Sequence, residues 1–142
     1  MNNEAEKDRI FCRHDITHLL DVARIGWCIS LEEGLDIEKE LVYGAALLHD
    51  IGKHRQYSEG IPHEQASASI ASEILRDCGF NDKESGVIIS AILAHRVESV
   101  SSEISLRGIL YRADKVSRPC YICSVERECS WKAGKKNNNI CY

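Results

Sequence analysis

The sequence predicts an all-α protein: a single-domain bundle of five core helices, followed by an irregular, cysteine-rich C-terminal tail. Three observations support this prediction. Apolar residues recur at helical spacing in five separate stretches, whereas no stretch shows the sustained alternation of a half-buried strand. Residues that start or stop helices separate these stretches. The 142 residues are enough for one sizeable core, and they contain no internal repeat.

The first two predicted helices follow from their apolar faces and their ends. Apolar residues from Ile16 to Trp27 have helical spacing, and Gly34 is a natural stop for this helix. Asp36 can cap a second helix, whose apolar positions lead to His49. The second helix therefore brings an apolar run, LVYGAALL, directly to a histidine.

The next stretch begins with a glycine-bounded segment. Residues 52–60 are expected to form a loop, with a glycine at each end. Pro62 then suits the first turn of a third helix, and the apolar positions of this helix continue to Gly79.

The last two helices are predicted from a capping signal and a second apolar face. Asn81 and Glu84 have the spacing of a capping box, and the helix that they open carries apolar residues to His95. The polar stretch VESVSSE, residues 97–103, is expected to be a loop. A fifth helix is predicted around residues 106–117.

Composition limits the class of protein. The formal net charge of −4 argues against a nucleic-acid polymer as partner, because such proteins usually carry a basic face. No apolar run approaches the roughly 18 residues of a membrane helix, and the polar first residues do not resemble a secretory signal. We therefore expect a soluble, cytoplasmic protein. In that reducing compartment the seven cysteines are expected to be thiols or metal ligands, with Cys28 and Cys78 in the core.

Polar residues stand at particular places on this helical frame. His14 and His18 are four residues apart near the start of the first helix, so they can share one face. His49 and Asp50 end the second helix, and Asp114 lies inside the fifth. A divalent cation would satisfy an imidazole and a carboxylate together, and helical bundles commonly build metal sites from facing helices.

Three motifs in this order resemble the HD-domain superfamily of metal-dependent phosphohydrolases, of the HDIG type. They are HLLDVARI after the first histidine, AALLHDIGK around the His-Asp pair, and ADK at the last aspartate. The resemblance covers residues 11–118 and implies an all-α fold with a five-helix core. It also implies a metal site made by His18, His49, Asp50 and Asp114.

The resemblance places an HD domain at residues 1–118, with residues 119–142 as a tail rather than a separate domain. His14 is the alternative to His18 as the first ligand. We prefer His18 because, as in the family, it directly precedes an apolar run. His14 is then expected to cap the helix, contact substrate or face solvent.

The family resemblance implies hydrolysis of a phosphoester or phosphoanhydride bond in a nucleotide or similar small phosphorylated molecule, by metal-activated water. The implied catalytic residues are Asp50, which could also orient the water, and Lys53, which could meet a phosphate. Arg96 is a further candidate for phosphate binding. The implied metal is Fe, Mn, Co or Ni, with Mg as a further option.

His63 and His95 raise the question of a second ion. Some HD branches carry similar histidines that hold a second metal, and the aspartate of the His-Asp pair then bridges the two ions. Otherwise the two histidines would contact substrate phosphate. One or two ions therefore stay open. Three features differ from the two-metal branch that acts on cyclic dinucleotides. His95 precedes Arg96 rather than another histidine, the loop after the His-Asp pair is short, and no Gly-Tyr-Pro signature follows HDIGK. The chain thus looks closer to the small bacterial branch that includes symmetrical diadenosine tetraphosphate hydrolases.

The tail contains a separate candidate site. Cys120 and Cys123 form a CxxC motif, and Cys129 follows six residues later. Cys12 or Cys141 could complete a four-cysteine zinc or iron–sulfur site, and Cys12 is preferred. Cys12 and Cys120 each lie six residues from a candidate ligand of the same metal, which keeps them within about 18 Å of it. The alternative is a set of reduced thiols on a flexible tail.

Two other function classes stay open at this point. One is a non-catalytic sensing or regulatory module that keeps the metal but has lost turnover. The other is a di-iron oxygenase, which would need a binuclear, histidine-rich site. The oligomeric state also stays open, with a homodimer as one option.

Overall fold

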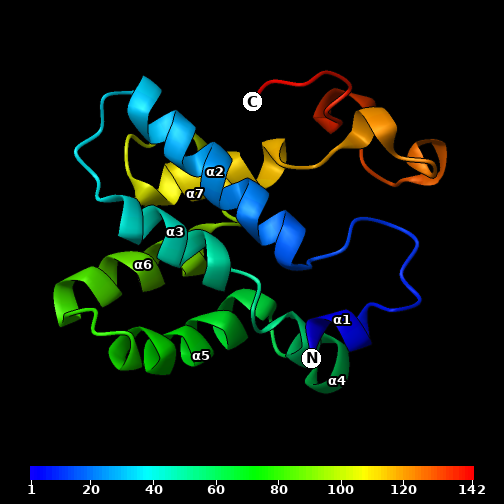
Figure 1. Cartoon of the computed structure of the whole chain (residues 1–142). Coiled ribbons are helices and arrows are strands. Elements are labelled where there is room, and N and C mark those ends of the chain that lie inside the picture. The colour runs from blue at the N-terminus through cyan, green and yellow to red at the C-terminus, as the bar shows by residue number, and fades with distance from the viewer.

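The computed structural model describes all residues from 1 to 142 and contains helices but no strands, which confirms the predicted all-α fold. Its α-helices are α1 (Asn2–Ala5), α2 (Ile16–Glu32), α3 (Lys39–Leu48), α4 (Lys53–Glu59), α5 (His63–Asp77), α6 (Asp82–Ala94) and α7 (Leu106–Val116). Short 3-10 helices are η1 (Glu98–Ser102), η2 (Cys120–Ile122), η3 (Glu126–Glu128) and η4 (Ala133–Lys135). The five predicted core helices correspond to α2, α3, α5, α6 and α7 (Figure 1). No helix has both the length and the apolar character needed to cross a membrane.

The core lies between two helical layers. Helix α2 packs on α3 and α7, while α6 packs on α3, α5 and α7 (Figure 1). Val22, Leu75, Ile92 and Ile109 supply fully buried aliphatic side chains from four of these helices. Many of the other core positions are alanines, which let the helices approach closely. This packing brings the C-terminal ends of α3 and α6 close to α7.

Two of the predicted helix ends are present. Gly34 follows α2 with a φ of 64°, a left-handed conformation that glycine adopts without strain. At the start of α6, Asn81 Oδ1 accepts a hydrogen bond from the Glu84 backbone N–H at 3.0 Å. Glu84 Oε2 accepts one from the Asn81 backbone N–H at 2.8 Å. This reciprocal pair is the capping box that the sequence predicted.

The start of the second helix was predicted wrongly. Asp36 does not cap α3, which begins at Lys39 after Glu38 and has no side-chain cap. Leu35 and Ile37 instead pack against the core from a non-helical segment. Burial of these two side chains outweighs the local capping preference of Asp36.

The prediction that residues 52–60 form a loop is also wrong. Residues Lys53–Glu59 form helix α4, with Gly52 at its N-cap and Gly60 at its C-cap in the left-handed conformation. The Arg55 guanidinium donates hydrogen bonds to Glu59 one turn further along. The two glycines therefore bound a short helix rather than a loop. Part of the expected loop 97–103 is likewise helical, as η1.

Helix α4 also orders the N-terminus. The Asn2 side chain donates a hydrogen bond to the Asp50 carbonyl oxygen at 2.7 Å and accepts one from the His54 backbone N–H at 2.9 Å. Helix α1 therefore lies against α4, as Figure 1 shows at the end of the chain marked N. The N-terminal residues cover the backbone beside the His-Asp pair.

The tail is irregular, as predicted, and it is tied to the end of α7. The Asn137 side chain donates hydrogen bonds to the carbonyl oxygens of Lys115, Val116 and Arg118 at 2.7, 3.1 and 3.0 Å. The Arg118 guanidinium lies over the Trp131 ring, 4.2 Å from its centroid. Cys28 and Cys78 are exposed, so their predicted place in the core is wrong. Cys28 lies on the solvent side of α2, and Cys78 follows the last residue of α5 as its C-cap.

Gly52→Ala is expected to lower the free energy of unfolding by roughly 1–3 kcal/mol, because the site has no room for a side chain. An added Cβ would lie 2.4 Å from the Ser67 backbone nitrogen and 2.6 Å from the Ala66 carbonyl carbon. Denaturant unfolding measures the loss. Gly86→Ala is the matched control, since its Cβ would meet nothing within 4 Å. Alanine in that helix should stabilise by up to about 1 kcal/mol. Equal stabilities of the two variants would contradict the close packing at Gly52.

Candidate metal centre

Six polar side chains converge where five helices meet. His18 lies in the first turn of α2, and His49 and Asp50 follow the last residue of α3. His63 opens α5 and His95 follows α6, while Asp114 lies in α7. Five of these residues are buried, and His18 is nearly so. The six are His18, His49, Asp50, His63, His95 and Asp114.

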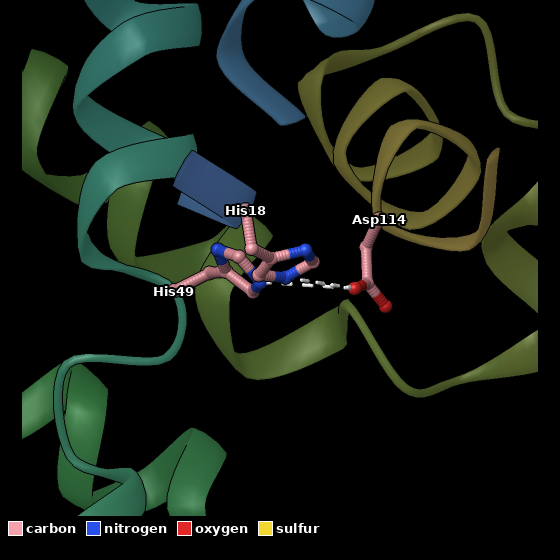
Figure 2. A group of neighbouring side chains, drawn as sticks. All are labelled: His18, His49 and Asp114. Atoms are coloured by element: carbon pink, nitrogen blue, oxygen red, sulfur yellow. Dashed lines mark ion pairs between the residues drawn. The ribbon is translucent and has the colours of Figure 1, made fainter. Parts of the chain in front are cut away.

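The first group of donor atoms joins three helices. His18 Nε2 lies 3.6 Å and His49 Nε2 lies 3.8 Å from Asp114 Oδ1. Figure 2 shows both imidazole rings pointing toward this carboxylate. Asp50 Oδ2 lies 3.3 Å from His49 Nε2 and 4.0 Å from His18 Nε2. These four residues are the set that the sequence order suggested, and their donor atoms face one another.

A second group shares the same aspartate. Asp50 Oδ1 lies 3.2 Å from His63 Nε2 and 3.8 Å from His95 Nε2. The two Nε2 atoms lie 3.1 Å apart. All three donor atoms fall within 4.8 Å of one another, as do those of His18, His49 and Asp114. One oxygen of Asp50 therefore faces each group.

Several of these buried atoms have no hydrogen-bond partner. They are His18 Nε2, His49 Nε2 and Asp50 Oδ1. A buried polar atom without a partner costs free energy, so such atoms clustered at one place need a common partner. Imidazole nitrogens and carboxylate oxygens at these separations fit a divalent cation.

Hydrogen bonds on the far side of the rings orient the donors. The Nδ1 atom of His49 lies 2.7 Å from the Ala46 carbonyl oxygen, and that of His95 lies 2.6 Å from the Ile92 carbonyl oxygen. His63 Nδ1 is paired with the amide oxygen of Gln56, on α4. Because these partners only accept, each Nδ1 carries a proton, so the neutral form of each imidazole presents its lone pair at Nε2.

Burial controls the charge states. Burial lowers the pKa of His18, His63 and His95 to about 4, so these rings are neutral near pH 7. Burial opposes charge on His49 too, but Asp50 and Asp114 outweigh it and raise its pKa to about 10. Without a cation, the His49 proton offsets the charge of the two carboxylates. A divalent ion would take over that role.

His14 is in the site rather than on the surface. Its expected roles as a helix cap or a solvent-facing residue are wrong, because Asp15 caps α2 and His14 is only 4% exposed. Its Nε2 lies 3.7 Å from Asp50 Oδ2, and its Nδ1 lies 2.7 Å from Glu6 Oε1. It also precedes α2 instead of sharing a helical face with His18. Contact with substrate stays a prediction.

The buried Glu6 was missed by sequence reasoning. Its carboxylate accepts hydrogen bonds from the His14 backbone N–H and from the Tyr57 hydroxyl, both at 2.7 Å. The carboxylate thus ties the N-terminal segment to α4 and orients His14. Nothing local marks Glu6 among the charged residues at the start of the chain, since both partners are reached only in the folded protein.

Four of the six donor residues, Asp50, His63, His95 and Asp114, border a cleft of about 350 Å³. Its walls carry an unusual number of cations for a protein with net charge −4. These are Arg9, Lys53, Arg96, Lys115, Arg118 and Lys135. The rings of Tyr111 and Trp131 line the same cleft. The local charge therefore suits an anionic ligand although the whole chain is acidic.

The two cations proposed from sequence differ in position. Lys53 is largely buried, and its Nζ lies 3.9 Å from Asp50 Oδ1. Arg96 is exposed on the rim, with its guanidinium 3.6 Å from Glu64. Two stronger candidates were missed, since the Lys115 ammonium contacts Asp114 Oδ2 and Arg118 lies 3.5 Å from Asp114 Oδ1. Their proximity to Asp114 in the motif ADK and just beyond it was the available signal.

Comparison with known proteins adds an independent line of evidence. A family model described as HD domain matches residues 15–118. An uncharacterised protein of Clostridium beijerinckii is 47% identical over 141 residues, covering 99% of this chain and 88% of that protein. Ribonuclease Y of Mycoplasma mycoides is 32% identical over 102 residues, which are 72% of this chain but only 18% of that protein. The crystal structure of a predicted HD superfamily hydrolase from an uncultured Thermotogales bacterium superposes with a TM-score of 0.70 and 27% identity, covering 94% of this chain and 76% of that one.

Proposed function

Because the chain belongs to the HD-domain family, we propose that it is a metal-dependent phosphohydrolase. Its proposed substrate is a nucleotide or a similar small phosphorylated molecule, cleaved at a phosphoester or phosphoanhydride bond. One observation carries the proposal: buried His and Asp donors border a cleft that six cationic side chains line. Metal donors and phosphate-binding cations at one place are what phosphoryl chemistry requires.

We further propose that the centre holds two divalent ions that share Asp50. His18, His49 and Asp114 would hold one ion, and His63 and His95 would hold the other. The support is that the two oxygens of Asp50 face different histidine groups. A mixture of imidazole and carboxylate suits Fe, Mn, Co or Ni. Ions bound there would acidify water and offset charge on a phosphoryl oxygen.

The residues of the cleft would position the substrate. Lys53, Lys115 and Arg118 surround the two buried carboxylates, so they can meet phosphate oxygens as these approach the donors. Tyr111 and Trp131 line the same cleft, and a base could stack on the face of each ring that Lys115 or Arg118 leaves uncovered. A nucleotide therefore fits the cleft better than inorganic phosphate alone.

A substrate panel tests this function. Purified protein, loaded with Mn, Fe or Co without oxygen, would be assayed with mononucleotides, dinucleoside polyphosphates and a short RNA. Hydrolysis of a small nucleotide supports the proposal. Cleavage of RNA alone would shift the function toward the ribonuclease Y relatives, of which this chain covers between 17% and 22%. If the protein binds a nucleotide tightly but does not hydrolyse it with any of the metals, a sensing module would be favoured instead.

Lys53→Ala is expected to lower kcat/KM about 10–100-fold on the correct substrate, because a charged hydrogen bond contributes about 1.5–3 kcal/mol. The metal content should not change, since an ammonium group cannot ligate a cation. Steady-state kinetics and elemental analysis measure both. Lys83→Ala, on the exposed surface of α6, is the matched control. Unchanged kinetics in Lys53→Ala would place this lysine outside substrate binding.

A further inference from the structure

A second cavity separates the segment before α2 from the tail. It has a volume of about 440 Å³. Four of the seven cysteines line it, namely Cys12, Cys120, Cys123 and Cys129. Figure 1 shows the segment between α1 and α2 and the tail after α7 on the same side of the molecule. Residues more than 100 positions apart therefore bring thiols to one hollow.

These four cysteines differ from the other three in their surroundings. Each of the four is partly buried, whereas Cys28, Cys78 and Cys141 are exposed and do not line this cavity. All seven are free thiols. Burial raises the pKa of the Cys12 thiol, and the nearby Cys120 and Cys123 thiols raise it further, while Arg118 opposes the rise. Partly buried thiols grouped around one cavity are costly to ionise, and a bound metal would offset that cost.

We propose that Cys12, Cys120, Cys123 and Cys129 bind an iron–sulfur cluster beside the His-Asp centre. Four cysteine thiolates are the usual ligands of [2Fe–2S] and [4Fe–4S] clusters. The cluster would join the first and last segments of the chain, where the fold supplies little apolar packing. This site is independent of the proposed hydrolytic function because its ligands lie outside the His-Asp set.

The spacing of the thiols favours a cluster over a single zinc ion. A tetrahedral zinc site holds four sulfurs about 3.8 Å apart, as bonds of about 2.3 Å require. No three of these thiol sulfurs lie within 4.8 Å of one another, although the same structure brings two His-Asp groups within that limit. A cluster spreads its thiolates, since they bond to different iron atoms.

Two cations lie near particular thiols, which suits the negative charge of a thiolate-bound cluster. Arg118 lies near Cys12 and Lys136 lies near Cys129. The lining as a whole is balanced, with Arg13, Arg118 and Lys136 beside Asp15, Asp21 and Glu126. Lys136 Nζ donates a hydrogen bond to Glu126 at 2.7 Å. This bond is the main reason that the pKa of Lys136 is raised, and Cys129 and Cys120 contribute to the rise. Positive charge beside the sulfurs stabilises a cluster and influences its potential.

The cavity also adjoins the proposed catalytic centre. His18, Ser117 and Arg118 line the cavity, and Arg118 lies 3.5 Å from Asp114 on its other side. Arg118 also stacks on Trp131, which follows Cys129 by two residues and lines the substrate cleft. Loss of the cluster would therefore loosen the tail that forms one wall of that cleft.

The test measures iron and acid-labile sulfide in the whole chain, purified without oxygen and reconstituted with ferric iron, sulfide and a thiol reductant, which together supply both oxidation states of iron. The wild type should contain about two or about four sulfides per chain, according to cluster type, with visible thiolate-to-iron absorbance. Cys120→Ser/Cys123→Ser should lose the sulfide. Cys28→Ser/Cys78→Ser, the matched control, should keep it. Sulfide content reports on the cluster alone, because the His-Asp centre binds none.

Folding is checked in the same samples. Circular dichroism and the metal content of the His-Asp centre show whether the double variant is folded. The single variants Cys12→Ser and Cys141→Ser provide a second comparison. The proposal expects sulfide loss in Cys12→Ser and retention in Cys141→Ser. A wild type that takes up no sulfide, contains zinc alone at these cysteines, or loses no sulfide in the double variant would overturn the cluster.

Discussion

Asp50→Asn is expected to abolish both metal binding and hydrolysis while leaving the helices intact. Asp50 presents one oxygen to His49 and the other to His63, so its loss affects both groups of donors. Removing an outer partner of a metal ligand costs about 10–100-fold in affinity, and removing a shared ligand should cost more. Elemental analysis after dialysis and assays on the correct substrate measure the two losses.

The control for this variant is Asp77→Asn, an exposed aspartate at the end of α5. It makes the same chemical change without touching the donors, so its metal content and activity should equal those of the wild type. Circular dichroism checks the fold of both variants. Undiminished metal in Asp50→Asn would show that the His-Asp cluster is not the metal site.

His63→Ala is expected to reduce the bound metal from about two ions per chain to about one. His63 Nε2 and His95 Nε2 belong to the second donor group only, and the first group keeps His18, His49 and Asp114. Hydrolysis should fall by more than about 100-fold if both ions take part in the reaction, because one of the two charges on the phosphoryl group is then lost. The ratio of metal to protein gives the primary result, and kinetics gives the second.

His54→Ala is the matched control for His63→Ala. His54 lies on α4, but its Nδ1 atom is 3.2 Å from the Ile51 carbonyl oxygen, and neither of the two donor groups includes it. Two ions should therefore remain in this variant. A wild type that binds a single ion at saturation, or a His63→Ala protein that still binds two, would contradict the shared centre.

The positions of the main helices could be predicted because their signals are local and repeated. The helical spacing in α2, α5 and α7 and the capping box of α6 depend on residues within a few turns of one another. Helix α4 could not be predicted in this way, since two turns between glycines are too short for a periodic pattern. The exposed Cys28 and Cys78 were misplaced for a related reason, because apolar spacing does not distinguish the edge of a helical face from its centre.

By itself, the sequence determined that the chain is all-α and that His18, His49, Asp50 and Asp114 stand in an order typical of an HD domain. Their role as ligands stays a prediction, but order along the chain was enough to select them. Only the tertiary structure decided which other residues join them. Glu6 reaches His14 through packing of the N-terminal segment, and His63 and His95 meet at Asp50 because α5 and α6 pack together. Such contacts depend on distances across the fold, which no local pattern records.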